Sequence, residues 1–130
     1  MSEAAVLGRR SPDEPLFARL GSVLIIDDEA AIRESLETLL EMEGYEVHSA
    51  ETAEDGLAQL GESSYDLVLL DLALPDRSGM DLLPEIAANH PGLPVIMITA
   101  YGTVENAVTA MQSGAVNFVQ KPWEDRKSVV

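Results

Sequence analysis

The chain has 130 residues, of which 46% are hydrophobic, 23 are Asp or Glu and 8 are Lys or Arg. This length suits one domain and is too short for most capped or two-lobed enzymes. The formal net charge of −15 opposes direct binding of nucleic acid, because a polyanion would be repelled. Without cysteine there are no disulfides, thiolate metal sites or thiol nucleophiles.

The first 20 residues are predicted to lie outside the fold as a flexible extension. They contain two prolines and show no sustained hydrophobic period. Docking through Leu16, Phe17 and Leu20 remains the alternative. The apolar run that follows, residues 23–26, is far shorter than the roughly 20 residues that span a bilayer. We therefore expect no membrane segment and a cytoplasmic location.

Short apolar runs then alternate with amphipathic segments. The runs predict strands over residues 23–26, 45–50, 67–70, 95–98 and 116–119. The segments between them predict four helices, two of them capped by Thr52 and Thr103. Pro84 falls in the third of these helices and fits only its first turn. Strands that alternate with helices predict an α/β fold with right-handed crossovers and a parallel sheet covered on both faces.

Most of the negative charge lies in this expected folded segment. Between Gly21 and Gln120 there are 18 acidic residues and only two basic ones, Arg33 and Arg77. Repulsion among so many like charges destabilises a compact state. The imbalance therefore favours a bound cation.

Polar residues stand at the ends of four predicted strands. Strand 23–26 is followed by Asp27 and Asp28, and the others lead into Asp71, Thr99 and Lys121. Ligands of open α/β sheets collect at the carboxyl ends of the strands. Taken singly, each carboxylate could instead cap the next helix, and the threonine could be an ordinary buried hydroxyl. Their joint occurrence favours one site.

The residue types at this edge point to phosphate chemistry. Carboxylates 4 Å apart repel by about 4 kcal/mol per pair at an effective dielectric of 20, and a divalent cation removes this repulsion. Oxygen ligands without His or Cys favour Mg²⁺. With Mg²⁺ and Lys121 the site would be near neutral and could take a phosphoryl group. Asp71 would then be the nucleophile, and Thr99 and Lys121 would hold the transferred oxygens.

Four segments resemble the receiver domain of two-component response regulators. They are VLIIDDE (residues 23–29), YDLVLLDLALP (65–75) with Gly79, ITAYG (98–102) and GAVNFVQKP (114–122). The resemblance covers about residues 21–127. It implies a flavodoxin-like, doubly wound sheet of five strands in the order 2-1-3-4-5.

The resemblance also assigns a role to each site residue. It implies that Asp71 accepts a phosphoryl group from the phosphohistidine of a histidine kinase. Asp27, Asp28, Asp71 and the main-chain carbonyl of Ala73 would hold Mg²⁺. Thr99 and Lys121 would contact the phosphoryl group. We expect no enzyme activity beyond this self-catalysed phosphorylation and dephosphorylation.

The same resemblance implies a conformational switch at strands 95–98 and 116–119. Its residues would be Thr99 and Phe118, although Phe118 stands where the family often has a tyrosine and so has no hydroxyl. Residues 99–103 and 118–123 are most similar to the branch attached to sigma-54-dependent transcriptional regulators. The switch would therefore control an output domain, which we expect to be transcriptional.

The C-terminal end departs from the family pattern. Residues 123–130 give barely two helical turns where the family has a full last helix, a linker and an output domain. The sequence therefore predicts a receiver domain over residues 21–130, with its final helix cut short and no output domain. The family often dimerises through the helix after Thr103 and the last helix, so the short end puts this homodimer in doubt.

Two other functions remain open. A pseudo-receiver would act by protein contact alone, although the expected phosphorylation residues are all present. A Mg²⁺-dependent phosphohydrolase of the haloacid type would need Asp-x-Asp-x-Thr after the first strand. Here Glu29 and Ala31 occupy the second and third of those positions. This makes the phosphohydrolase the weaker alternative.

Overall fold

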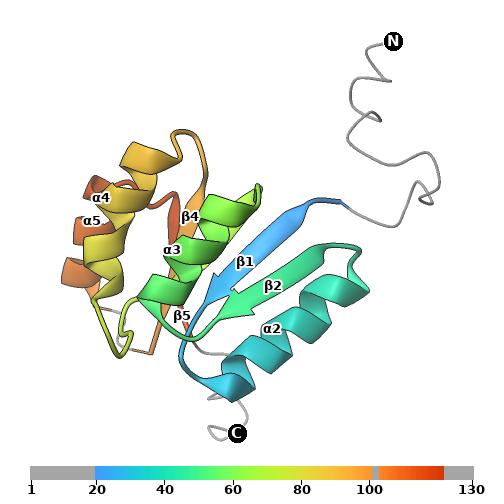
Figure 1. Cartoon of the computed structure of the whole chain (residues 1–130). Helices are drawn as coiled ribbons and strands as arrows, with labels where there is room; N and C mark the ends of the chain where they lie inside the picture. Colours follow the sequence, from blue (N-terminus) through green and yellow to red (C-terminus); the bar gives the residue numbers. More distant parts are fainter. Residues whose placement is uncertain (1–19, 101–102, 122–130) are drawn as a thin grey trace, which may run out of the picture.

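Five parallel strands form the centre of the molecule in the computed structural model, which describes residues 20–100 and 103–121 (Figure 1). Their order in the sheet is β2-β1-β3-β4-β5. The strands are β1 (Ser22–Ile26), β2 (Glu46–Ala50), β3 (Leu67–Asp71), β4 (Val95–Thr99) and β5 (Asn117–Gln120). Each lies within one residue of its predicted bounds. The predicted parallel α/β sheet and its strand order are confirmed.

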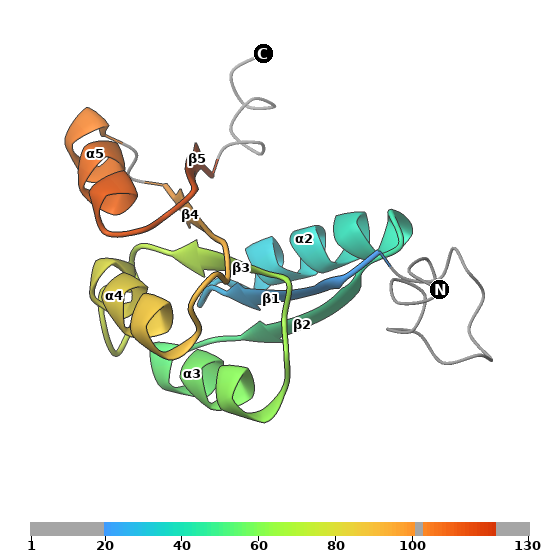
Figure 2. The same cartoon turned by 90° about the horizontal axis from the view of Figure 1, so that it is seen from above.

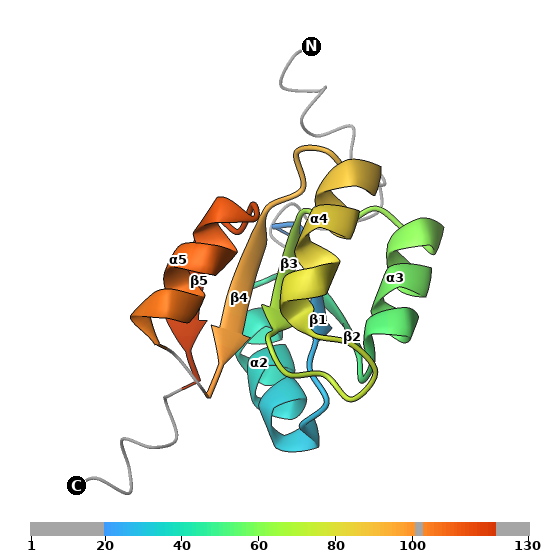
Figure 3. The same cartoon turned by 90° about the vertical axis from the view of Figure 1, so that its left-hand side faces the viewer.

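Four helices connect the strands and cover both faces of the sheet. They are α2 (Ala30–Met42), α3 (Ala53–Glu62), α4 (Gly79–Asn89) and α5 (Val104–Gln112). Helix α2 lies on one face, and α3, α4 and α5 lie on the other (Figures 2 and 3). None of the helices in the described part of the chain is long and apolar enough to cross a membrane.

Alternate residues of each strand supply the two hydrophobic layers. On β1, Leu24 and Ile26 belong to the larger cluster with residues of α3, α4 and α5, whereas Val23 and Ile25 belong to a smaller cluster that packs against Leu36 of α2. Side chains alternate between faces because a strand has a two-residue repeat. A continuous apolar run is therefore what a strand buried on both faces requires.

The helix starts agree with the predicted caps, with one correction. The side chains of Thr52 and Thr103 accept hydrogen bonds from the first turns of α3 and α5, as predicted. The expectation that Pro84 lies in the first turn of α4 is wrong. Ser78 caps α4, whose first residue is Gly79, so Pro84 lies in the second turn. It is exposed there, so its ring does not disturb the core.

Gly79 is required where α4 begins against the strand that carries Asp71. A Cβ atom at Gly79 would lie 2.2 Å from the backbone oxygen of Asp71, far inside contact distance. We expect Gly79→Ala to lower the free energy of unfolding by about 1–3 kcal/mol, because backbone must move. Urea denaturation measures this.

Gly61 provides the matched control. It lies in α3, and a Cβ there would meet nothing within 4 Å. We expect Gly61→Ala to raise stability by up to about 1 kcal/mol, because alanine favours helix. Equal effects of the two substitutions would contradict the crowding at Gly79.

Candidate functional site

Four polar residues are buried at the carboxyl edge of the sheet. Asp27 follows β1, Asp71 ends β3, Thr99 ends β4 and Lys121 follows β5. Their exposed fractions are 0%, 2%, 0% and 6%, and they are the buried polar or charged residues of the described chain. These are four of the residues that the sequence predicted. The parallel topology brings them together because every strand ends at the same edge.

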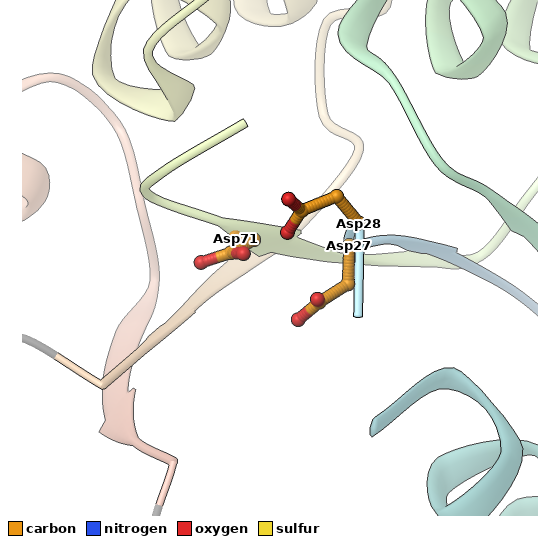
Figure 4. A group of neighbouring side chains, drawn as sticks. All are labelled: Asp27, Asp28 and Asp71. Atoms are coloured by element: carbon orange, nitrogen blue, oxygen red, sulfur yellow. The ribbon is translucent and has the colours of Figure 1, made fainter. Parts of the chain in front are cut away.

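Three carboxylates form a cluster that can hold a cation. Ligand oxygens from Asp27, Asp28 and Asp71 all lie within 4.8 Å of one another. Figure 4 shows these side chains together, Asp27 and Asp28 from the end of β1 and Asp71 from the end of β3. We call these three residues the acidic cluster. Asp28 is exposed, whereas the other two are buried, so the cluster opens to solvent on one side.

The acidic cluster fits a hard divalent cation. Its donors are all oxygens, as Mg²⁺ prefers. One oxygen of Asp27 accepts a hydrogen bond from the backbone N–H of Glu29 at 2.8 Å. The other, Oδ2, is buried and has no hydrogen bond among the described residues, although the Lys121 ammonium lies 3.0 Å away. A bound cation would complete the coordination of this oxygen.

Among the described residues, Lys121 supplies the positively charged side chain of this site. Its Nζ lies 3.0 Å from Asp27 Oδ2 and 3.2 Å from Asp71 Oδ2, and it also donates to Glu29 Oε1. Its backbone N–H donates to the carbonyl oxygen of Thr99 at 2.6 Å, which ties the end of β5 to β4. One ammonium thus faces three carboxylates that come from two different strand ends.

The electrostatics of the site reflect burial and crowding. Burial, and then the neighbouring Asp27 carboxylate, raise the pKa of Asp71 to about 6. Burial also raises the pKa of Asp27. Burial by itself would lower the pKa of Lys121, but its close contacts with the carboxylates of Glu29 and Asp27 and the charge of Asp71 raise that pKa above the ordinary lysine value. The protein therefore holds more negative charge here than Lys121 alone balances.

The loop after β3 is closed on itself next to Asp71. Ala73 forms an isolated bridge with Ser78, and the N–H of Gly79 donates to the carbonyl oxygen of Leu72 at 2.7 Å. The N–H of Ala73 donates to Asp71 Oδ1 at 3.3 Å. Ala73, whose carbonyl is the expected metal ligand, is exposed in this loop.

The predicted switch residues lie on the neighbouring strands. Thr99 is fully buried and pairs with Gln120 in the β4–β5 register. Phe118 is partly buried on β5, pairs with Met97 and packs against the larger hydrophobic cluster. Their role in switching stays a prediction.

Two residues that contact the site were not predicted from the sequence. Glu29 was not assigned to it, yet it contacts Lys121; its place directly after Asp27 and Asp28 was the available signal. Arg33 donates from Nη1 to the carbonyl oxygen of Asp27 at 2.8 Å, and its Nη2 lies 3.5 Å from Glu51. No local pattern marked Arg33, because its partner is a backbone atom.

Comparison with known proteins decides the family. The family model described as "Response regulator receiver domain" matches residues 23–129. The chain belongs to this family. The receiver domain is 43% identical over 99 residues to the response regulator protein PilR of Pseudomonas aeruginosa, which covers 76% of the chain and 22% of PilR. It is 40% identical over 100 residues to the transcriptional regulatory protein GlrR of Escherichia coli, covering 77% of the chain and 22% of GlrR.

A solved structure supports the same assignment. The beryllofluoride-activated NtrC4 receiver domain dimer matches with a TM-score of 0.76 and 35% identity, over 83% of this receiver domain and 89% of that chain. PilR and GlrR belong to the sigma-54 activator branch, so the predicted resemblance to that branch is confirmed. The chain spans less than a quarter of the length of either regulator.

The predictions for the chain ends lie outside the described residues. The flexible extension falls on residues 1–19, with only Leu20 described and exposed, and the shortened last helix falls on residues 122–130.

Proposed function

We propose that Asp71 accepts a phosphoryl group from the phosphohistidine of a sensor histidine kinase, in a Mg²⁺-dependent reaction. The observation that carries the proposal is the burial of Asp71 between Asp27 and Lys121, with Asp28 completing the acidic cluster. An ordinary helix cap would need neither a second buried carboxylate nor a buried ammonium. Membership in the receiver family supports the same reaction.

The transfer makes one bond and breaks one. A carboxylate oxygen of Asp71 attacks phosphorus, the bond from phosphorus to the histidine nitrogen breaks, and that nitrogen keeps the electron pair. The product is an acyl phosphate on Asp71. Lys121, 3.2 Å from Asp71 Oδ2, and the Thr99 hydroxyl would hold the phosphoryl oxygens.

Three further groups would hold the cation with Asp71: the carboxylates of Asp27 and Asp28 and the main-chain carbonyl of Ala73. When bound, Mg²⁺ supplies charge neutralisation for the transferred group. Apart from its own phosphorylation and dephosphorylation, the domain would turn over no substrate.

The signal would leave the site through β4 and β5. Thr99 ends β4. If its hydroxyl donates a hydrogen bond to the phosphoryl group, the Thr99 side chain would move and change the packing next to Phe118. Large apolar side chains are exposed on α5 (Val108 and Met111), just before β5 (Val116) and on β5 (Val119). We expect the region of α5 and β5 to contact a transcriptional output domain or a second copy of the receiver.

Phosphorylation by a small donor tests the proposal. With acetyl phosphate and Mg²⁺, the wild-type protein should gain the mass of one phosphoryl group, and Asp71→Asn should gain none. Chelation of Mg²⁺ should prevent the gain. Beryllofluoride with Mg²⁺ should shift the amide NMR signals of α5 and β5 in the wild type only. An unchanged mass and spectrum in the wild type would favour the pseudo-receiver.

A further inference from the structure

The loop after β3 is anchored at a point that the proposed chemistry does not use. This loop, residues 72–78, carries Ala73 and is closed near its base by the Ala73–Ser78 bridge. At the far side of the loop, Asp76 reaches helix α3. Its Oδ1 accepts a hydrogen bond from the N–H of Ala53 at 2.9 Å, and its Oδ2 accepts one from the N–H of Glu54 at 3.0 Å.

These two bonds tie the loop to α3 by an ionised carboxylate. The N–H groups of Ala53 and Glu54 lower the pKa of Asp76, so it stays charged at neutral pH. A helix N-terminus favours negative charge. Asp76 is itself exposed and could be hydrated by water. Solvation of the carboxylate therefore does not require these two bonds.

Capping of α3 does not by itself explain Asp76. Thr52, the residue before α3, already accepts a hydrogen bond from the N–H of Asp55 at 3.0 Å. Thr52 belongs to the segment next to the helix, whereas Asp76 comes from a loop more than 20 residues away. Among the hydrogen bonds of the described residues, those of Asp76 join α3 to the loop that follows Asp71.

The loop after β1, which carries Asp27 and Asp28, also contacts the segment that leads into α3. Residues 50–54 run from the end of β2 into α3. The N–H of Asp27 donates to the carbonyl oxygen of Ala50 at 3.0 Å, and Arg33 links the Asp27 carbonyl to Glu51. The segment 50–54 thus contacts the loop after β1 through Ala50 and Glu51, and the loop after β3 through Ala53 and Glu54.

We propose that Asp76 is a positioning residue for the cation site. By holding the loop of residues 72–78 on α3, it fixes the Ala73 carbonyl relative to Asp27 and Asp28. This inference rests on the proposed function, because it concerns the affinity for the same Mg²⁺. Groups that orient metal ligands commonly change affinity 10–100-fold when they are removed.

Mg²⁺ titration of Asp76→Ala, with Thr52→Ala as matched control, tests this role. Both substitutions remove side-chain acceptors of N–H groups in the first turn of α3. We expect the Kd for Mg²⁺ to rise about tenfold in Asp76→Ala and less than twofold in Thr52→Ala. Asp76→Asn keeps one acceptor oxygen and should fall between. NMR titration gives the Kd, and hydrogen exchange of the Ala53 and Glu54 amides reports release of the loop.

The outcomes separate this inference from the proposed function. A wild-type protein that does not bind Mg²⁺ would overturn the proposed function. A wild type that binds Mg²⁺, with Asp76→Ala of equal affinity, would overturn only the positioning role. Equal losses in Asp76→Ala and Thr52→Ala would assign the effect to helix capping. A loss that disappears in 0.5 M salt would assign it to the missing charge, because salt screens exposed charges.

Discussion

Replacing Lys121 with methionine should destabilise the receiver domain by about 3 kcal/mol at pH 7 without divalent cations. Methionine keeps most of the apolar stem but removes the ammonium that lies 3.0 Å from Asp27 and 3.2 Å from Asp71. Two buried carboxylates would then remain without a counter-charge. Urea denaturation measures the loss, and Mg²⁺ should restore more stability to the variant than to the wild type.

Two controls show whether the buried charges cause the effect. Arg77 makes a partly exposed ion pair with Glu85 at 2.9 Å, and Arg77→Met should cost no more than about 1 kcal/mol. Adding Asp71→Asn to Lys121→Met should recover part of the loss, because it removes one of the two buried carboxylates that lack a counter-charge. A Lys121→Met variant as stable as Arg77→Met would show that Lys121 does not balance the site.

Asp71→Asn should stabilise the protein by about 2 kcal/mol at pH 7 in metal-free buffer. The pKa of Asp71 is raised to about 6 in the folded protein, from 3.8. The folded state therefore holds this proton more tightly than the unfolded state does. The stability from that proton is fully present below about pH 4 and is lost as the pH rises through 6. At pH 7 the wild type carries a buried ionised carboxylate that the amide lacks.

The pH profile and Mg²⁺ distinguish this electrostatic cause from a packing effect. The advantage of Asp71→Asn should shrink as the pH falls from 7 to 4, because the wild-type carboxyl becomes protonated. Mg²⁺ should stabilise the wild type more than the variant, since only a folded site binds the ion. A variant whose advantage is independent of pH, or that is less stable than the wild type at pH 7, would contradict this cause. It would show that the ionised Asp71 carboxylate does not lower the stability of the folded protein.

The sequence predicted the layout of the sheet because strands and helices leave local patterns. Runs such as residues 23–26 and 67–70 are apolar on both faces of a strand, and the structure buries them on both, apart from the half-buried Leu67. The polar residues at the strand ends could also be predicted to converge, because parallel strands end at one edge of a sheet. Predicting that four polar residues meet at this edge therefore required only the strand boundaries and the topology. These residues are Asp27, Asp71, Thr99 and Lys121.

The contacts around those residues depended on the tertiary structure. Glu29 and Lys121 are 92 positions apart, and Asp76 meets α3 across 22 or 23 positions. An exposed carboxylate such as Asp76 has water as an alternative partner, so its residue type does not reveal whether it will bond to the protein. The place of Pro84 in α4 also depended on a tertiary contact, since Gly79 begins the helix against the backbone of Asp71.

The sequence by itself thus determined the buried strands β1, β3 and β4 and which polar groups stand at the carboxyl edge of the sheet. The tertiary structure decided how one ammonium is shared among Asp27, Glu29 and Asp71, and which helix holds the loop after β3. The physical reason is the range of the forces involved. Burial of apolar side chains follows from the local repeat of a strand or helix, whereas a hydrogen bond or ion pair forms only when the whole fold brings two particular atoms within about 3 Å.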